Sequence, residues 1–164
     1  MQSYLHPFPP ILDHHTRVLF LGSLPSIASF EHSFYYAHPR NAFWPILEEI
    51  FDVHLESNEA KKKFCLEKGI GLWDVIASCE RSNSSDTNLK NCIPNDFKKL
   101  LRDYPNIEAL GFTGKKSYDL FQKYFKELEV EKLLLPSTSP AHAAMKREEK
   151  VKIYKEFLDG YLAV

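Results

Sequence analysis

The sequence predicts a single α/β domain in which helices cover both faces of a mainly parallel central sheet. Its 164 residues are enough to bury one hydrophobic core, and no repeat or long linker divides them. With 44% hydrophobic and 26% charged residues, the composition is that of an ordinary globular protein. Short apolar runs that end at glycine or proline alternate with stretches of helical periodicity, which is the order of elements in parallel sheets.

In the first half, the run VLFLGS is typical of a buried strand, and FWPILEEIF is typical of a helix with Pro45 in its first turn. A second helix is expected between Ser57, as N-cap, and the terminating Gly69. The segment GIGLWDVI fits either a strand or an irregular buried stretch, and the polar residues after it predict a loop. The predicted elements are therefore strand 18–23, helix 43–51, helix 58–68, buried segment 69–76 and loop 78–91.

The second half alternates more regularly between strand and helix. Its predicted elements are helix 96–104, strand 107–114, helix 115–125, strand 131–136 and helix 146–162. One apolar stripe marks the last helix, formed by Val151, Tyr154, Phe157, Leu158 and Tyr161. In parallel sheets, ligands bind at the carboxyl ends of the strands. Because loops 22–43 and 136–143 both follow strands, we expect them to meet at that edge.

Loop 22–43 carries two motifs that allow both functional and structural interpretations. In GSLPS, Gly22 permits a tight turn or the close approach of a ligand, and Pro25 stiffens the loop. In AHPRNAFW, the Asn41 amide could read a base edge or hold a water molecule, but it could equally cap the next helix. Phe43 could stack on a base or lie in the core, and His38 is expected to be structural.

The segment LPSTSPAHAAM, residues 135–145, predicts a rigid polar loop between the last strand and the last helix. Hydroxyls and backbone amides near a helix N-terminus suit phosphate contacts, although the same residues could simply cap the helix. The lysines of GKKS, residues 114–117, could likewise contact phosphate or only face solvent.

Composition excludes several classes of function. With a formal net charge of −1, any nucleic-acid binding must come from a local patch. The cysteines Cys65, Cys79 and Cys92 form no C-x-x-C pair, so we expect free thiols and no metal site. Neither a signal peptide nor an apolar run of membrane-spanning length is seen. A cytoplasmic monomer is therefore expected.

Together, GSLPS, YYAHPRNAFW and LPSTSPAHA, in this order and spacing, resemble the uracil-DNA glycosylase superfamily, most closely its hypoxanthine-DNA glycosylase branch. The resemblance covers most of the chain and implies one glycosylase-like domain, 1–164, with a three-layer α/β/α sandwich. It also implies an enzyme that flips a deaminated base out of DNA and hydrolyses its N-glycosidic bond without a cofactor or metal. The substrate implied first is hypoxanthine.

The sequence departs from the uracil enzymes at two positions. Leu24 stands where they carry Asp or Asn, and Ser137 stands where they carry His or Asn. The resemblance therefore assigns catalysis to Asn41. It places in the base pocket Gly22, Ser23, Leu24, Tyr36, Phe43 and Ser137. It assigns to DNA binding Ser26, Arg40, Thr138, Ser139, Pro140, Ala141 and His142.

Three alternatives to this function remain open. The first is a mismatch-type uracil glycosylase that also works through Asn41. The second is a catalytically silent member that only binds damaged or single-stranded nucleic acid. The third is a small-molecule hydrolase using Ser23 or Ser137, which no Ser-His-acid order supports.

Overall fold

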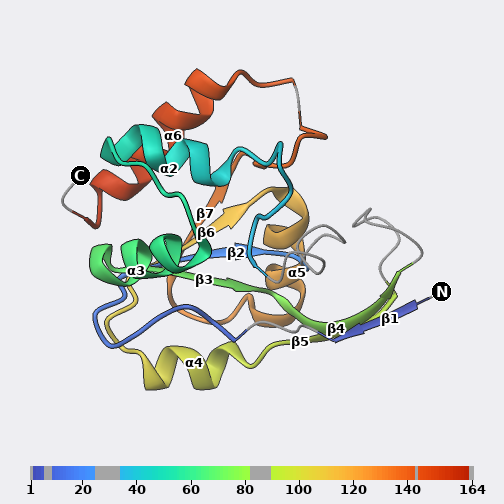
Figure 1. Ribbon diagram of the computed structural model, residues 1–164. Coiled ribbons are helices and arrows are strands. Elements are labelled where there is room, and N and C mark those ends of the chain that lie inside the picture. The colour runs from blue at the N-terminus through green and yellow to red at the C-terminus, as the bar shows by residue number, and fades with distance from the viewer. Residues whose placement is uncertain (1, 6–8, 25–33, 82–89, 143, 163–164) are drawn as a thin grey trace.

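A four-stranded parallel sheet forms the centre of the protein (Figure 1). The computed structural model describes residues 2–5, 9–24, 34–81, 90–142 and 144–162. In sheet order the strands are β3 (Ile70–Asp74), β2 (Val18–Gly22), β6 (Ala109–Thr113) and β7 (Glu131–Leu135). The predicted parallel sheet is confirmed, and of the buried segment 69–76 the residues Ile70–Asp74 form its strand β3.

Helices cover both faces of this sheet, which confirms the three-layer arrangement (Figure 1). On one face lie α2 (Phe43–Phe51), α3 (Asn58–Lys68) and α6 (Arg147–Asp159). On the other lie α4 (Phe97–Asp103) and α5 (Lys115–Phe125). Side chains alternate along β2, so that Val18 and Phe20 enter the first core and Leu19 and Leu21 enter the second.

A separate three-stranded antiparallel sheet lies beside the central one and corrects the predicted loop 78–91. Its strands are β1 (Gln2–Leu5), β4 (Ile76–Arg81) and β5 (Lys90–Pro94), with β4 in the middle. Residues 82–89 lie outside the described residues. The polar composition suggested a loop, but pairing with the N-terminal strand β1 places residues 78–81 in β4, and residues 90–91 begin β5.

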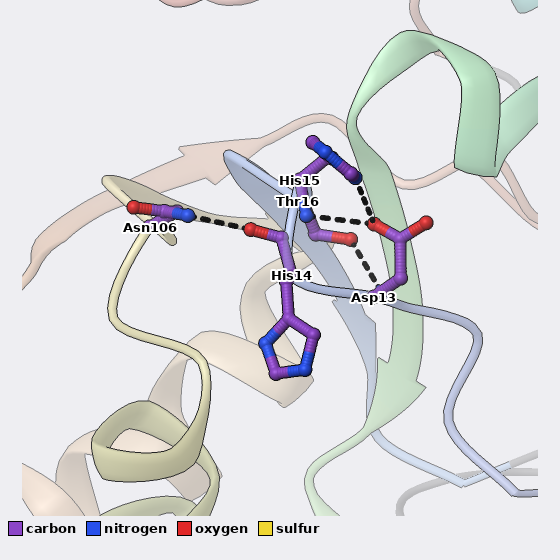
Figure 2. A network of polar contacts seen from close by, with 5 residues as sticks. All are labelled: Asp13, His14, His15, Thr16 and Asn106. Atoms are coloured by element: carbon purple, nitrogen blue, oxygen red, sulfur yellow. Dashed lines mark hydrogen bonds and ion pairs between the residues drawn. The ribbon is translucent and has the colours of Figure 1, made fainter.

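A polar network at the amino end of the parallel strands closes the turn before β2 (Figure 2). Thr16 Oγ1 accepts a hydrogen bond from Asp13 N, and Asp13 Oδ1 accepts one from His15 N. Asn106 Nδ2 donates to His14 O, which joins this turn to the residues before β6. Because ligands bind at the opposite ends of such strands, we interpret these histidines as structural.

The chain path marks where a ligand would enter. After β2 the chain leads to α2 on one face, whereas after the adjacent strand β6 it leads to α5 on the other. Neighbouring strands whose connections diverge in this way leave a crevice at their carboxyl ends. No helix in the described part of the chain is long and apolar enough to span a membrane.

Candidate active site

The loops after β2 and β7 meet at the carboxyl edge of the sheet, as the sequence predicts. Ala42 N donates a hydrogen bond of 2.9 Å to Thr138 O, which joins the segment containing Asn41 to the loop containing Ser137. Of the residues assigned to DNA binding, Ser26 lies outside the described part of the chain, as does Ala143 in loop 136–143.

The end of β2 is held against β3 and its continuation. Gly22 is paired with Asp74, and Val75 N and Ile76 N donate to the carbonyls of Gly22 and Ser23. Ser23 and Leu24 are buried, each with 6% of its surface exposed. A Cβ atom on Gly22 would lie 2.5 Å from Asp74 Oδ1, so this position has no room for a larger residue while Asp74 keeps its place. The glycine is therefore needed for a close approach.

Asp74 is the site residue that sequence reasoning missed. Its side chain is 4% exposed, although it ends a strand at the edge where the two loops meet. Burial, and after it the negative charge of Asp74, raises the pKa of Tyr35 and of Tyr36, so both phenols remain protonated at neutral pH. The carboxylate at this edge of the sheet therefore comes from Asp74 at the end of β3, and not from the motif GSLPS. An acidic residue ending the apolar run GLW was the available signal.

Tyr36 is linked by hydrogen bonds to the carboxyl ends of β6 and β2. Its hydroxyl lies 3.1 Å from Thr113 Oγ1, which in turn donates to Leu21 O. Its backbone has a φ of 53°, a left-handed conformation that non-glycine residues adopt rarely and that tends to occur at functional sites. The half-buried ring stacks on Phe43, with centroids 4.1 Å apart and planes 16° from parallel.

The placement of Phe43 corrects the expectation that its own ring offers an open face to a base. Phe43 is 0% exposed and packs edge-on against Phe20 and Trp44. Tyr36 covers the face that would otherwise be turned to the crevice. As the first residue of α2, Phe43 points into the core, so the ring nearer the crevice belongs to Tyr36.

The side chain of Asn41 contacts the start of α2, although the N-cap position itself is occupied by Ala42. Its side-chain carbonyl Oδ1 accepts a 2.9 Å hydrogen bond from Phe43 N, the first amide of α2. Because the amide of Phe43 is a donor, the atom that it contacts must be the oxygen, which leaves the donor group Nδ2 outside this hydrogen bond. No described residue accepts a hydrogen bond from Nδ2. The oxygen therefore holds the helix start, and the amide can donate to a ligand.

The residues before Asn41 form a compact turn at the surface. Arg40 is exposed, and its backbone N donates to Nδ1 of His38 at 3.0 Å. His38 O accepts from Asn41 N. His38 thus shapes the turn, as the sequence predicts for a structural histidine, while the guanidinium of Arg40 faces solvent.

Loop 136–142 is stiffened by hydrogen bonds within itself. Ser137 Oγ accepts from Ser139 N, and Ser139 accepts from Ala141 N through its hydroxyl and from His142 N through its carbonyl. Thr138 is 2% exposed, whereas Pro140 and Ala141 form an exposed tip. Gly114 lies beneath the loop, where an added Cβ would meet Ser137 Cβ at 3.2 Å. The loop is a rigid projection whose tip is free to meet a partner.

The described residues contain no group of three or more histidine, cysteine or acidic side chains arranged to hold a metal ion. The polar side chains on the segments that meet at the carboxyl edge are instead hydrogen-bonding groups, Tyr36, Asn41, Asp74, Thr113 and Ser137. Such a set suits the recognition of a flat polar molecule, in which each edge group needs a donor or an acceptor.

Comparison with known proteins gives a consistent result over nearly the whole chain. The family model of the uracil DNA glycosylase superfamily matches residues 9–159. A protein of Methanosarcina barkeri named hypoxanthine DNA glycosylase is 35% identical over 145 residues, covering 87% of this chain and 91% of that protein. One of the same name from Methanosarcina acetivorans is 34% identical, with 82% and 86% covered.

A solved structure shows the same fold. The solution NMR structure of a candidate uracil DNA glycosylase from Methanosarcina acetivorans superposes with a TM-score of 0.79 at 31% sequence identity. The match covers 93% of this chain and 96% of that one.

Proposed function

The chain belongs to the uracil-DNA glycosylase superfamily, and on this premise we propose that it is a DNA glycosylase that excises deaminated bases, hypoxanthine first. The observation that carries the proposal is the hydrogen bond from Ala42 N to Thr138 O. It joins the Asn41 segment to the loop after β7, and Gly22, Tyr36 and Asp74 have contacts at the same carboxyl edge of the sheet. Two relatives named hypoxanthine DNA glycosylase support the choice of base.

Base selection is assigned to the carboxylate of Asp74. Deamination of adenine turns its N1 from a hydrogen-bond acceptor into an N1–H donor. An ionised carboxylate only accepts hydrogen bonds, so it pairs with that donor and opposes the acceptor of adenine. A buried site built around such a hydrogen bond discriminates strongly against a base that lacks the donor. Xanthine and uracil carry the equivalent N–H, which makes them the secondary substrates.

Stacking is assigned to Tyr36, with Phe43 as its support. A flipped base needs an aromatic face to replace the neighbours it leaves in the duplex. Tyr36 lies nearest the crevice, and Phe43 behind it holds the ring in place at 4.1 Å. The hydrogen bond to Thr113 fixes the ring from its other end.

Catalysis is assigned to Asn41. In the reaction the C1′–N9 bond breaks, its electron pair goes to the base, and a water molecule adds its oxygen to C1′ and yields the proton that the base takes up. A donor aimed at the base stabilises the negative charge that develops on it. Since Oδ1 of Asn41 accepts from Phe43 N, we assign the donation to Nδ2. Leu24, at the end of the loop after β2 that the structure describes, is apolar and buried, so it adds no polar group.

Binding of DNA is assigned to exposed Arg40 and to the tip of loop 136–142. Arg40→Ala is expected to weaken binding of damaged and undamaged duplex equally, because a phosphate contact carries no base information. The slope of log affinity against log salt should become shallower by about 1, the value for one lost phosphate contact. Fluorescence anisotropy over a salt series measures both. A loss confined to the damaged duplex would instead place Arg40 at the base.

The direct test of the activity uses labelled oligonucleotides carrying one deoxyinosine, deoxyuridine or deoxyxanthosine, with an undamaged duplex as control. After incubation with the protein, alkali cleaves at abasic sites. Cleavage is expected first at deoxyinosine and should persist in EDTA, because the resemblance implies no metal. Cleavage at deoxyuridine alone would favour a mismatch-type uracil enzyme. Binding without cleavage of any substrate would identify a silent member. A monomer working in the cytoplasm remains the prediction from the sequence.

A further inference from the structure

A buried lysine lies beneath the loop that we assign to DNA. Lys150, in the first turns of α6, is only 4% exposed. Burial lowers its pKa, which is the expected effect of removing an ammonium group from water. Lysine is among the side chains least often buried, and an ammonium group that leaves water needs close partners.

The partners of Lys150 are the two ends of the loop. Its Nζ donates hydrogen bonds of 2.8 Å to Ser137 O and of 2.8 Å to His142 O. One turn further along α6, the hydroxyl of Tyr154 donates to Pro136 O at 2.6 Å. Helix α6 therefore binds three carbonyl oxygens of the loop. Two of them accept hydrogen bonds from the ammonium group of Lys150.

The loop passes this constraint to the catalytic segment. Thr138, between the two residues that Lys150 holds, accepts the hydrogen bond from Ala42 N. Asn41 directly precedes Ala42. A displacement of loop 136–142 would thus be transmitted to the residue that we assign to catalysis.

We propose that Lys150 is a positioning residue, which fixes loop 136–142 in the geometry that binds DNA and, through Thr138, orients the Asn41 segment. The inference rests on the proposed function. A buried apolar side chain of similar size usually stabilises a fold at least as well as a buried charge. An apolar residue, however, cannot donate hydrogen bonds to two separate carbonyl oxygens, as Lys150 does. Lys150 also places a positive charge under the loop that we assign to the binding of anionic phosphates.

The test compares Lys150→Met with Lys152→Met, which removes an exposed lysine from the same helix. Amide hydrogen exchange of residues 137–142 reports on the loop without any DNA. We expect exchange there to become about 10-fold faster or more in Lys150→Met, while α2 and the central sheet keep their protection. Lys152→Met should match the unmodified protein. Equal loop protection in both variants would overturn the proposal, as would a general loss of protection in Lys150→Met.

Function provides the second measurement. In Lys150→Met the KM for a deoxyinosine duplex should rise about 10-fold, as expected when charge-assisted hydrogen bonds are lost. Binding of free hypoxanthine should change less than binding of the duplex, because Lys150 donates to Ser137 and His142 and makes no hydrogen bond to Tyr36 or Asp74, to which we assign stacking and base selection. If the pure protein cleaves no substrate, the proposed function fails, but the exchange experiment still decides the role of Lys150. Fast loop exchange with unchanged KM would show that the loop is held by Lys150 yet does not serve DNA, which overturns the proposal.

Discussion

Replacing Asn41 with alanine is expected to lower the rate of hypoxanthine excision by on the order of 100-fold or more, the usual effect of removing one oriented transition-state donor. The alanine variant lacks the amide nitrogen that, in our proposal, donates a hydrogen bond to the leaving base. Neither Leu24 nor Ser137 is expected to take over, since Leu24 is apolar and Ser137, tied into its own loop by the bond from Ser139 N, offers only one weak O–H donor. Single-turnover excision measures the chemical step directly.

The structural hydrogen bond of Asn41 to the start of α2 must be separated from the catalytic role that we propose for it. The alanine variant also loses the acceptor for Phe43 N, which costs about 1 kcal/mol of stability in typical helix caps. Asn41→Asp and Asn41→Ser both keep an oxygen near that amide but have no side-chain amide donor. Both should unfold close to the temperature of the unmodified protein, bind damaged duplex and fail to excise. Full activity in Asn41→Ser would show that Asn41 is only a cap.

Replacing Asp74 with alanine is expected to lower hypoxanthine excision by roughly 10- to 150-fold, which corresponds to 1.5–3 kcal/mol for a hydrogen bond to a charged group. The base would enter the crevice without an acceptor for its N1–H. Because the carboxylate is nearly fully buried, little solvent is available to replace it. The measurement is kcat/KM on deoxyinosine and deoxyuridine duplexes, with thermal unfolding as the check on folding.

Asp74→Asn is the matched variant for the Asp74 prediction. It has the same size but can offer either an amide donor or a neutral oxygen. It should therefore keep part of the activity on hypoxanthine and lose part of the discrimination against adenine, whose N1 accepts a hydrogen bond. An unchanged ratio of hypoxanthine to adenine excision in both variants would mean that Asp74 does not read the base.

The predictions that proved reliable concern short stretches of chain. Ser57 accepts a hydrogen bond from Ala60 N, and Gly69 ends the same helix with a φ of 78°. Both follow from the chemistry of residues a few positions apart, which the sequence displays directly. The carboxyl ends of parallel strands share one edge, so the meeting of the two motif loops also follows from the order of elements.

What only the tertiary structure decided involves partners that are far apart in the sequence. Asp74 enters the crevice because β3 pairs with β2, which sets it beside Gly22. The ring of Tyr36, and not that of Phe43, faces the crevice because α2 turns Phe43 into the core. Lys150 resembles any surface lysine of a helix until loop 136–142 folds over it. Residue type and spacing determine local conformation, but burial and hydrogen-bond partners depend on which distant segments pack together.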